Sequence, residues 1–117
     1  MAKATFVVFT NPVSADAEDE YNRWYQDVHL KDVLAIDGFV SAQRFRFIDV
    51  AALGDVPAPS HPYLALYEFD GDDVEATAAA MSAAAGTDAM VMSPALDGDN
   101  ARAWFAEPIG ARVTASS

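Results

Sequence analysis

The residues best suited to chemistry gather in one stretch, residues 21–38. It reads Y-N-R-W-Y-Q-D-V-H-L-K-D-V-L-A-I-D-G and holds two of the four tyrosines, one of the two tryptophans and one of the two histidines. Imidazole titrates near neutral pH, so His29 is the first candidate for a general acid or base. The alternative is a histidine that hydrogen-bonds the end of a strand and fixes the end of a helix.

The spacing within this stretch predicts a helix with a change of phase. Aromatic and apolar residues recur at steps of three and four in its first half: Tyr21, Trp24, Tyr25 and Val28. Those of its second half would point to the opposite side of a straight helix: Leu30, Val33 and Leu34. We therefore expect the helix to bend, end or restart near His29. An imidazole at the carbonyl end of a helix would be favoured in its protonated form.

Two further polar groups could take part in the same chemistry. Arg44 lies in an otherwise small and apolar strand pattern, where it could hold an anion that gains charge in a transition state. A buried ion pair with Glu68 or Asp32 is the alternative. Asp32 could orient His29, or be exposed beyond the helix break.

Aromatic residues could complete a pocket. The hydroxyls of Tyr25, Tyr63 and Tyr67 could transfer protons or hold the oxygen of an aromatic substrate, although ordinary core tyrosines fit the same pattern. Four other aromatic residues could form walls or plain core: Trp24, Phe9, Phe45 and Phe47. His61 falls in a proline-rich loop, residues 49–62, and is expected to be exposed.

The elements that must position these residues follow from periodicity and turn signals. Apolar runs predict strands at 4–10, 39–48, 63–69 and 101–106. Helices are expected after a cap at Ser14 or Asp16, through His29 and on to residue 36, and again over 74–85. The order strand, helix, strand, strand, helix, strand predicts an α+β fold of the ferredoxin-like βαββαβ type. Residues 1–117 would form one domain, a four-stranded antiparallel sheet with two helices on one face.

The faces of the strands bear on assembly. Strands 4–10 and 63–69 are apolar on both faces, while two helices cover only one face of a sheet. Packing against the sheet of a second copy would cover the other face. The sequence therefore predicts a homodimer.

Composition narrows the classes of function. A net charge of −11 repels phosphate backbones and anionic lipids, so neither nucleic acid nor membrane is an expected partner. The chain has no cysteine and two histidines, so we expect no metal site and no cofactor. The apolar run near the start is too short for a signal peptide, which makes a cytoplasmic location the expectation.

Residues 21–45 and 61–69 resemble the EthD-like branch of the dimeric α/β-barrel superfamily. The shared features are an aromatic helix with W-Y-x-x-H and a hydrophobic residue, then a glycine and a strand arginine: Trp24, Tyr25, His29, Leu30, Gly38 and Arg44. Lys31 departs from the proline that is common at its position. The resemblance implies a dimeric barrel, and relatives include polyketide cyclases, muconolactone isomerases, cofactor-free monooxygenases and haem-degrading enzymes.

Together these features predict a cofactor-free enzyme that moves protons on an aromatic or enolisable small molecule in an apolar pocket. The reaction would be of the isomerase, cyclase, dehydratase or decarboxylase type. His29 would move the proton, Arg44 would hold the developing anion, and Tyr25 or Tyr67 would orient the substrate. A protein that binds a hydrophobic small molecule without transforming it is the alternative, and a cofactor-free or haem-linked monooxygenase is the second alternative.

Overall fold

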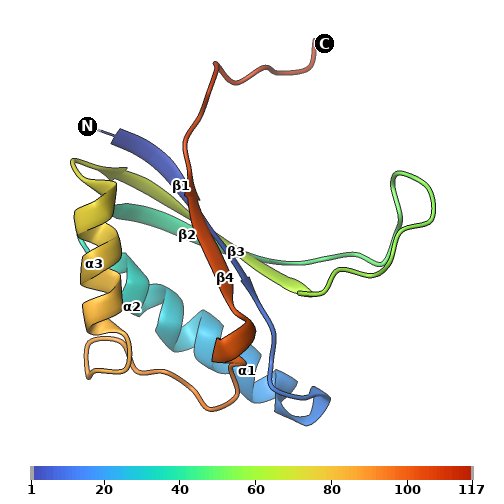
Figure 1. Cartoon of the computed structure of the whole chain (residues 1–117), viewed down its shortest axis with the longest axis horizontal. Helices are drawn as coiled ribbons and strands as arrows, with labels where there is room; N and C mark the ends of the chain where they lie inside the picture. Colours follow the sequence, from blue (N-terminus) through green and yellow to red (C-terminus); the bar gives the residue numbers. More distant parts are fainter. Residues whose placement is uncertain (1, 117) are drawn as a thin grey trace.

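Four strands form one antiparallel sheet in the order β2-β3-β1-β4 (Figure 1). This computed structural model describes residues 2–116 of the chain. The strands are β1 (Ala2–Thr10), β2 (Phe39–Arg46), β3 (Tyr63–Gly71) and β4 (Arg102–Ala106). All four lie within two residues of the ranges that alternation predicts.

Two helical segments cover one face of the sheet, as expected. The first is built from a short 3₁₀ turn (Ala15–Ala17), α1 (Glu18–Trp24), a π-helical turn (Tyr25–His29) and α2 (Leu30–Leu34). The second is α3 (Val74–Ala84). Side chains of Ser14 and Asp73 cap their starts by accepting hydrogen bonds from backbone N–H groups. The α+β arrangement is compatible with a ferredoxin-like fold.

The expected phase change in the first helix is absorbed without a break. The N–H of Leu30 donates to the carbonyl of Tyr25, five residues back, and α-helical geometry resumes directly. This wider turn rotates the second half, so that Leu30 and Val33 are buried on the same side as Tyr21 and Tyr25. Val28, expected on the buried stripe, is instead 40% exposed. His29 is therefore inside a continuous helix and not at a carbonyl end.

A β-bulge changes the face of one aromatic residue. The register between β2 and β3 shifts between Phe39 and Ser41, which leaves Val40 as an extra residue. Phe39 consequently faces the helices and packs against Phe6, with ring centroids 6.0 Å apart. Simple alternation would have placed Phe39 on the other face, together with Phe45.

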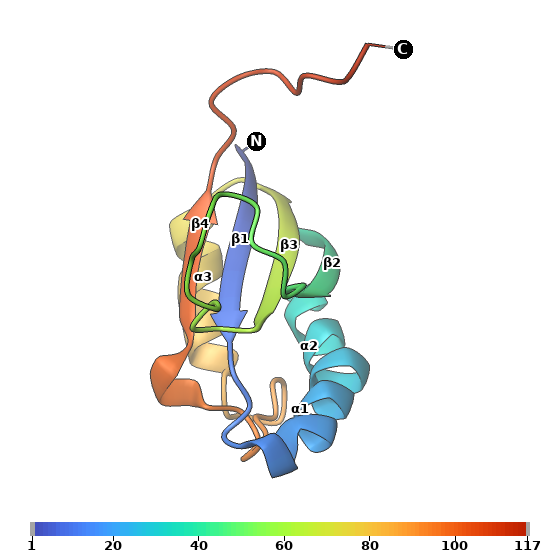
Figure 2. The same ribbon diagram turned by 90° about the vertical axis from the view of Figure 1, so that its right-hand side faces the viewer.

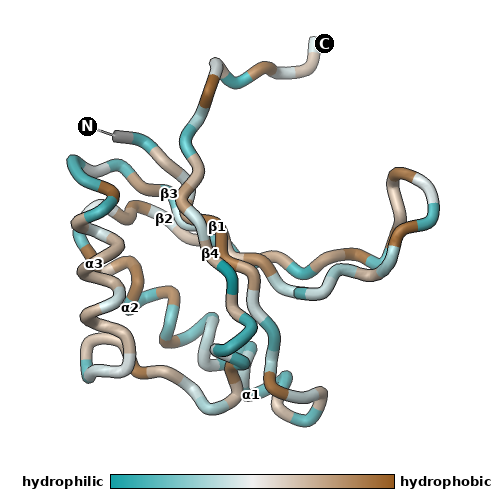
Figure 3. Tube along the Cα trace, viewed as in Figure 1, coloured by the Kyte–Doolittle hydropathy of each residue, from teal (hydrophilic) through white to brown (hydrophobic). Residues whose placement is uncertain are grey.

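The opposite face of the sheet carries no helix. Figure 2 shows this face toward the viewer, with α3 behind the sheet and the β2–β3 loop projecting in front. Large apolar side chains on it stay half-exposed, including Phe45 (40%), Phe47 (42%) and Trp104 (60%). The projecting loop also has hydrophobic stretches (Figure 3), and its Ile48 and Leu53 are more than 80% exposed, at 81% and 88%. This open face is defined here by Val7, Phe9, Phe45, Phe47, Leu64, Leu66 and Trp104.

The turn into β2 needs a glycine for two reasons. Gly38 has a φ of +106°, and a Cβ added there would come within 2.3 Å of the Phe69 ring. Phe69 is 2% exposed and packs edge-on against Phe39 at 5.8 Å. Close approach of backbone and ring thus joins the end of the first helix to the centre of the sheet.

Gly38→Ala is predicted to destabilise the fold strongly. Left-handed strain adds about 1 kcal/mol and displacement of the Phe69 ring about 1–3 kcal/mol more. Gly54→Ala is the matched control, because φ is +74° there but no atom lies within 4 Å of the added Cβ. Urea denaturation of both variants measures the difference, and equal losses of stability would show that the contact with Phe69 is unimportant.

Candidate functional site

An apolar cavity of about 440 Å³ lies between the sheet and the two helical segments. Its floor comes from β1, β3 and β4, including Phe6, Val8 and Tyr67. Tyr25, His29 and Val33 form one wall, and Met81 and Ser82 of α3 form another. The remaining wall is the segment that links α3 to β4, through Met90, Met92 and Leu96. No Lys, Arg, Asp or Glu belongs to the lining.

His29 lines this cavity between two aromatic rings. It stacks on Trp24 with a centroid distance of 4.6 Å and meets the Tyr25 ring edge-on at 5.0 Å. Its Nδ1 is buried and has no hydrogen-bond partner. Burial lowers the pKa of His29 to about 4, with Arg44 acting in the same direction and Asp32 opposing both. The imidazole is therefore neutral at pH 7, contrary to the expectation of a proton held by the helix dipole.

Two tyrosine hydroxyls share the cavity with His29. Tyr67 is 1% exposed and its hydroxyl has no hydrogen-bond partner. Burial raises the pKa of Tyr25 to about 12 and raises that of Tyr67 further, and the two phenols lie close enough to affect each other. Both stay protonated at physiological pH. Each can donate a hydrogen bond to an oxygen atom of a bound molecule.

Arg44 lies on the far side of Tyr25 and does not line the cavity. Its Nη2 donates to Asn22 Oδ1 at 2.7 Å, and its guanidinium carbon is 4.5 Å from the Tyr25 ring centroid. The rings of Tyr21 and Tyr63 lie at 5.5 and 5.4 Å from the same carbon. Neither expected carboxylate pairs with it, since Glu68 faces the opposite side of the sheet. The tyrosine faces stabilise the cation instead.

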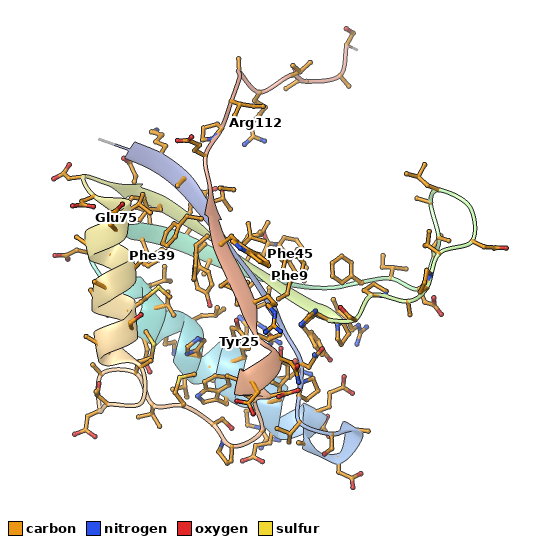
Figure 4. All side chains as sticks on the ribbon, viewed as in Figure 1. Phe9, Tyr25, Phe39, Phe45, Glu75 and Arg112 are labelled. Atoms are coloured by element: carbon orange, nitrogen blue, oxygen red, sulfur yellow. The ribbon has the colours of Figure 1, made fainter. Side chains whose placement is uncertain are left out.

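The other expected pocket residues do not line the cavity, and Figure 4 labels two of them, Phe9 and Phe45. Phe9 and Phe45 belong to the open face and cannot line the cavity, because neighbouring residues of a strand point to opposite sides. Tyr63 is 5% exposed, does not line the cavity, and donates a hydrogen bond to Glu18 Oε2 of α1 at 2.6 Å. Trp24 lies behind His29. Asp32 is half-buried near His29, without a hydrogen bond to it.

Several lining residues were not anticipated as part of a site. Thr10 ends the inward-facing row of β1 and hydrogen-bonds the Tyr21 hydroxyl. Alternation along residues 4–10 places Thr10 on the same side as Phe6 and could have identified it. Met81 and Ser82 had no such signal, because the alanine-rich pattern of α3 shows no clear apolar stripe. His61, expected to be exposed, is partly buried and bonds Asn100 O at 2.6 Å.

These features define an α+β protein with one half-covered sheet and an apolar cavity that holds neutral polar groups. Comparisons with protein-family models, with curated proteins and with solved structures gave no match. Over residues 2–116, no helix is long and apolar enough to cross a membrane. Within the same residues, no group of three or more His, Asp or Glu side chains could hold a metal ion.

The depressed pKa of His29 predicts a pH-dependent stability. Its pKa is about 4 in the folded chain against an ordinary 6.5, so the unfolded chain binds more protons between these values. Stability from this group is complete above pH 6.5 and falls as the pH drops to 4, by up to about 3 kcal/mol.

Replacing the imidazole by an amide removes that dependence. We expect the free energy of unfolding of His29→Gln to fall less than that of the wild type between pH 7 and pH 4.5. Urea denaturation across this range gives both curves. Parallel curves would mean that the folded environment leaves the His29 proton equilibrium unchanged.

Proposed function

We propose that this protein is a cofactor-free enzyme that transfers a proton on a neutral, enolisable small molecule bound in the cavity. One observation carries the proposal: His29 Nδ1 and the Tyr67 hydroxyl are both buried, both without a partner, and both in residues that line one apolar cavity. Buried polar atoms without partners are rare because each costs about 1–3 kcal/mol. A ligand that supplies an acceptor and an acidic proton would satisfy them.

The chemistry follows from the neutral state of these groups. A neutral His29 accepts a proton from a carbon next to a carbonyl, and the electron pair of the broken C–H bond moves to the carbonyl oxygen. The O–H groups of Tyr67 and Tyr25 stabilise the resulting enolate, as preorganised donors do best in a dry site. The imidazolium then returns its proton to another carbon of a conjugated enolate, giving isomerisation, or to a departing hydroxyl, giving dehydration. In ring closure the enolate carbon attacks a second carbonyl of the same molecule, and the imidazolium protonates the alkoxide that forms.

The lining favours a neutral substrate over an anionic one. A carboxylate in this cavity would lose its hydration without gaining a cation, because Arg44 lies beyond the Tyr25 ring. The net charge of −11 on the chain also repels an anionic substrate. Isomerisation, cyclisation and dehydration therefore fit the site better than decarboxylation, and Arg44 has no direct part in them.

Exchange of the α-protons of 2-tetralone in D₂O tests this proposal. This ketone is neutral, apolar and enolisable, and proton NMR follows its exchange without any assumption about the natural product. We expect the wild type to accelerate exchange over buffer, and His29→Gln to lose about 10²-fold or more of that acceleration. Tyr67→Phe removes one donor and should lose about 10-fold or more.

The controls separate catalysis from binding alone. Trp104→Phe alters an aromatic residue of the open face and should exchange at the wild-type rate. If His29→Gln retains the full rate, the proton-transfer proposal is wrong. Saturable binding of 2-tetralone without faster exchange would instead favour a protein that binds a small molecule without transforming it. The unpartnered Tyr67 hydroxyl supports that alternative equally.

We also infer that two copies of the chain pack through their open faces, as in a dimeric α/β barrel. The supporting observation is the row of half-exposed apolar side chains along strands that are covered on the other side, including Phe45 and Trp104. Stacked sheets pack about 10 Å apart and bury such rows between them. A second copy fits because the same apolar surface on both subunits is self-complementary.

A charge placed on the open face should dissociate this dimer. Trp104→Glu would bury two unpaired carboxylates across the interface, so we expect light scattering to show a shift from dimer mass to monomer mass at micromolar concentration. Val13→Glu is the control, since Val13 is also about half-exposed, at 53%, but lies off the sheet. A monomeric wild type would contradict the inference directly.

A further inference from the structure

We infer that Trp24 is a positioning residue that joins the cavity wall formed by residues 86–97 to the His29 side chain, so that opening this wall and exposing the base to water occur together. The inference rests on the proposed role of His29 and adds a means of controlling it. It identifies Trp24 and the link between α3 and β4 as the entry side of the cavity.

The wall segment is anchored at its two ends. At one end the N–H of Thr87 donates to Ala84 O of α3 at 3.0 Å. At the other, Val13 N donates to Ala95 O at 2.8 Å and Asp97 N donates to Asn11 O at 3.0 Å. Figure 1 shows the segment running from the end of α3 past α1 toward β4. Both anchors are backbone pairs, so the chain between them can move while they hold.

The middle of the segment is attached to the first helix through Trp24. The indole Nε1–H donates to Val91 O at 2.9 Å. The flanking residues Met90 and Met92 both line the cavity, yet Val91 and Met92 are exposed to solvent at 53% and 38%. A single side-chain hydrogen bond near the surface adds little stability, so the middle of the wall can open at modest cost.

The same indole controls the surroundings of His29. Its ring stacks on the imidazole at 4.6 Å with an interplanar angle of 26°. If the Val91 contact opens, the indole is free to rotate and water reaches the imidazole face that it had covered. Desolvation is the largest influence on the pKa of His29, ahead of the charges of Asp32 on the same helical segment and Arg44 on β2. Tyr25 and Tyr67 also face the imidazole side of the cavity, and residues 86–97 and α3 bring no charged side chain to the lining.

Trp24→Phe isolates this role, because phenylalanine keeps an aromatic ring beside His29 but cannot donate to Val91 O. NMR titration of His29 should show its pKa rise from about 4 to about 5 or above in the variant. Amide hydrogen exchange of Met90, whose N–H donates to Thr87 O at 3.0 Å, should quicken by about 5-fold or more. Trp104→Phe should change neither quantity.

A second variant keeps the test decisive if Trp24→Phe folds poorly. Met90→Ala removes a side chain that is 2% exposed and loosens the wall, while the Trp24 side chain itself is unaltered. In a Trp104→Phe background, Trp24 is the sole source of indole emission, and we expect Met90→Ala to shift that emission to longer wavelength and to raise the His29 pKa. An unchanged His29 pKa in both variants overturns the inference.

These readouts need no substrate. If the wild type does not accelerate 2-tetralone exchange but the Trp24 variant changes the His29 pKa, the proposed reaction is wrong and the control of His29 by Trp24 stands. If the wild type accelerates exchange but the His29 pKa is unchanged in the variants, the proposed reaction stands and the control by Trp24 is wrong.

Discussion

The structure depends on one constraint, that both halves of the first helix must bury their apolar side chains against the same face of the sheet. The Tyr21–Tyr25 half and the Leu30–Val33 half are out of phase for a regular α-helix, and the π-helical turn between them restores alignment. That turn is less stable than α-helix, so burial of four large side chains must outweigh it. Its position also decides where Tyr25 and His29 lie: both project from the widened turn into the cavity. The same π-helical turn therefore aligns the buried side chains of the helix and positions Tyr25 and His29 in the cavity.

Burial then determines the chemistry that the cavity allows. At pH 7 an imidazole with a pKa of about 4 is protonated in about one molecule in a thousand, so His29 can receive a proton but can scarcely supply one at the outset. An enolate and an imidazolium formed together are a pair, and their attraction is strong where the effective dielectric constant is low. In the proposed reaction, the phenol donors of Tyr25 and Tyr67 would stabilise the negative partner without adding a net charge. Arg44 already lowers the pKa of His29 from its place over the Tyr25 ring, and a guanidinium inside the cavity would lower the basicity of His29 further.

Much of the fold was predictable from sequence, because strand alternation and turn residues act locally. The inward row of β3, with Tyr63 and Tyr67, and the glycine turn at Gly38 follow from such signals. The bulge after Phe39 and the π-helical turn were not predictable, since each is set by pairing or packing with distant parts of the chain. For the same reason, the sequence suggested wrongly that Arg44 faces His29. Strand alternation gives the side of the sheet on which Arg44 lies, but only packing shows that a tyrosine ring stands between the two side chains. The family resemblance remains a prediction, because no comparison tests it.

The alternation of strands also separates two surfaces that a sequence reading combines. Phe9 and Phe45 are as aromatic as Tyr67, yet they belong to the open face, and only the thickness of the sheet separates the two groups. Each central strand therefore contributes to both surfaces through adjacent residues, as Leu66 and Tyr67 do on β3. A subunit that packs on the open face would restrain the same backbone that carries the Tyr67 hydroxyl. Covering one face would thus rigidify the donor on the other, and the aromatic residues outside the cavity would support the proposed site through the backbone that they share with it.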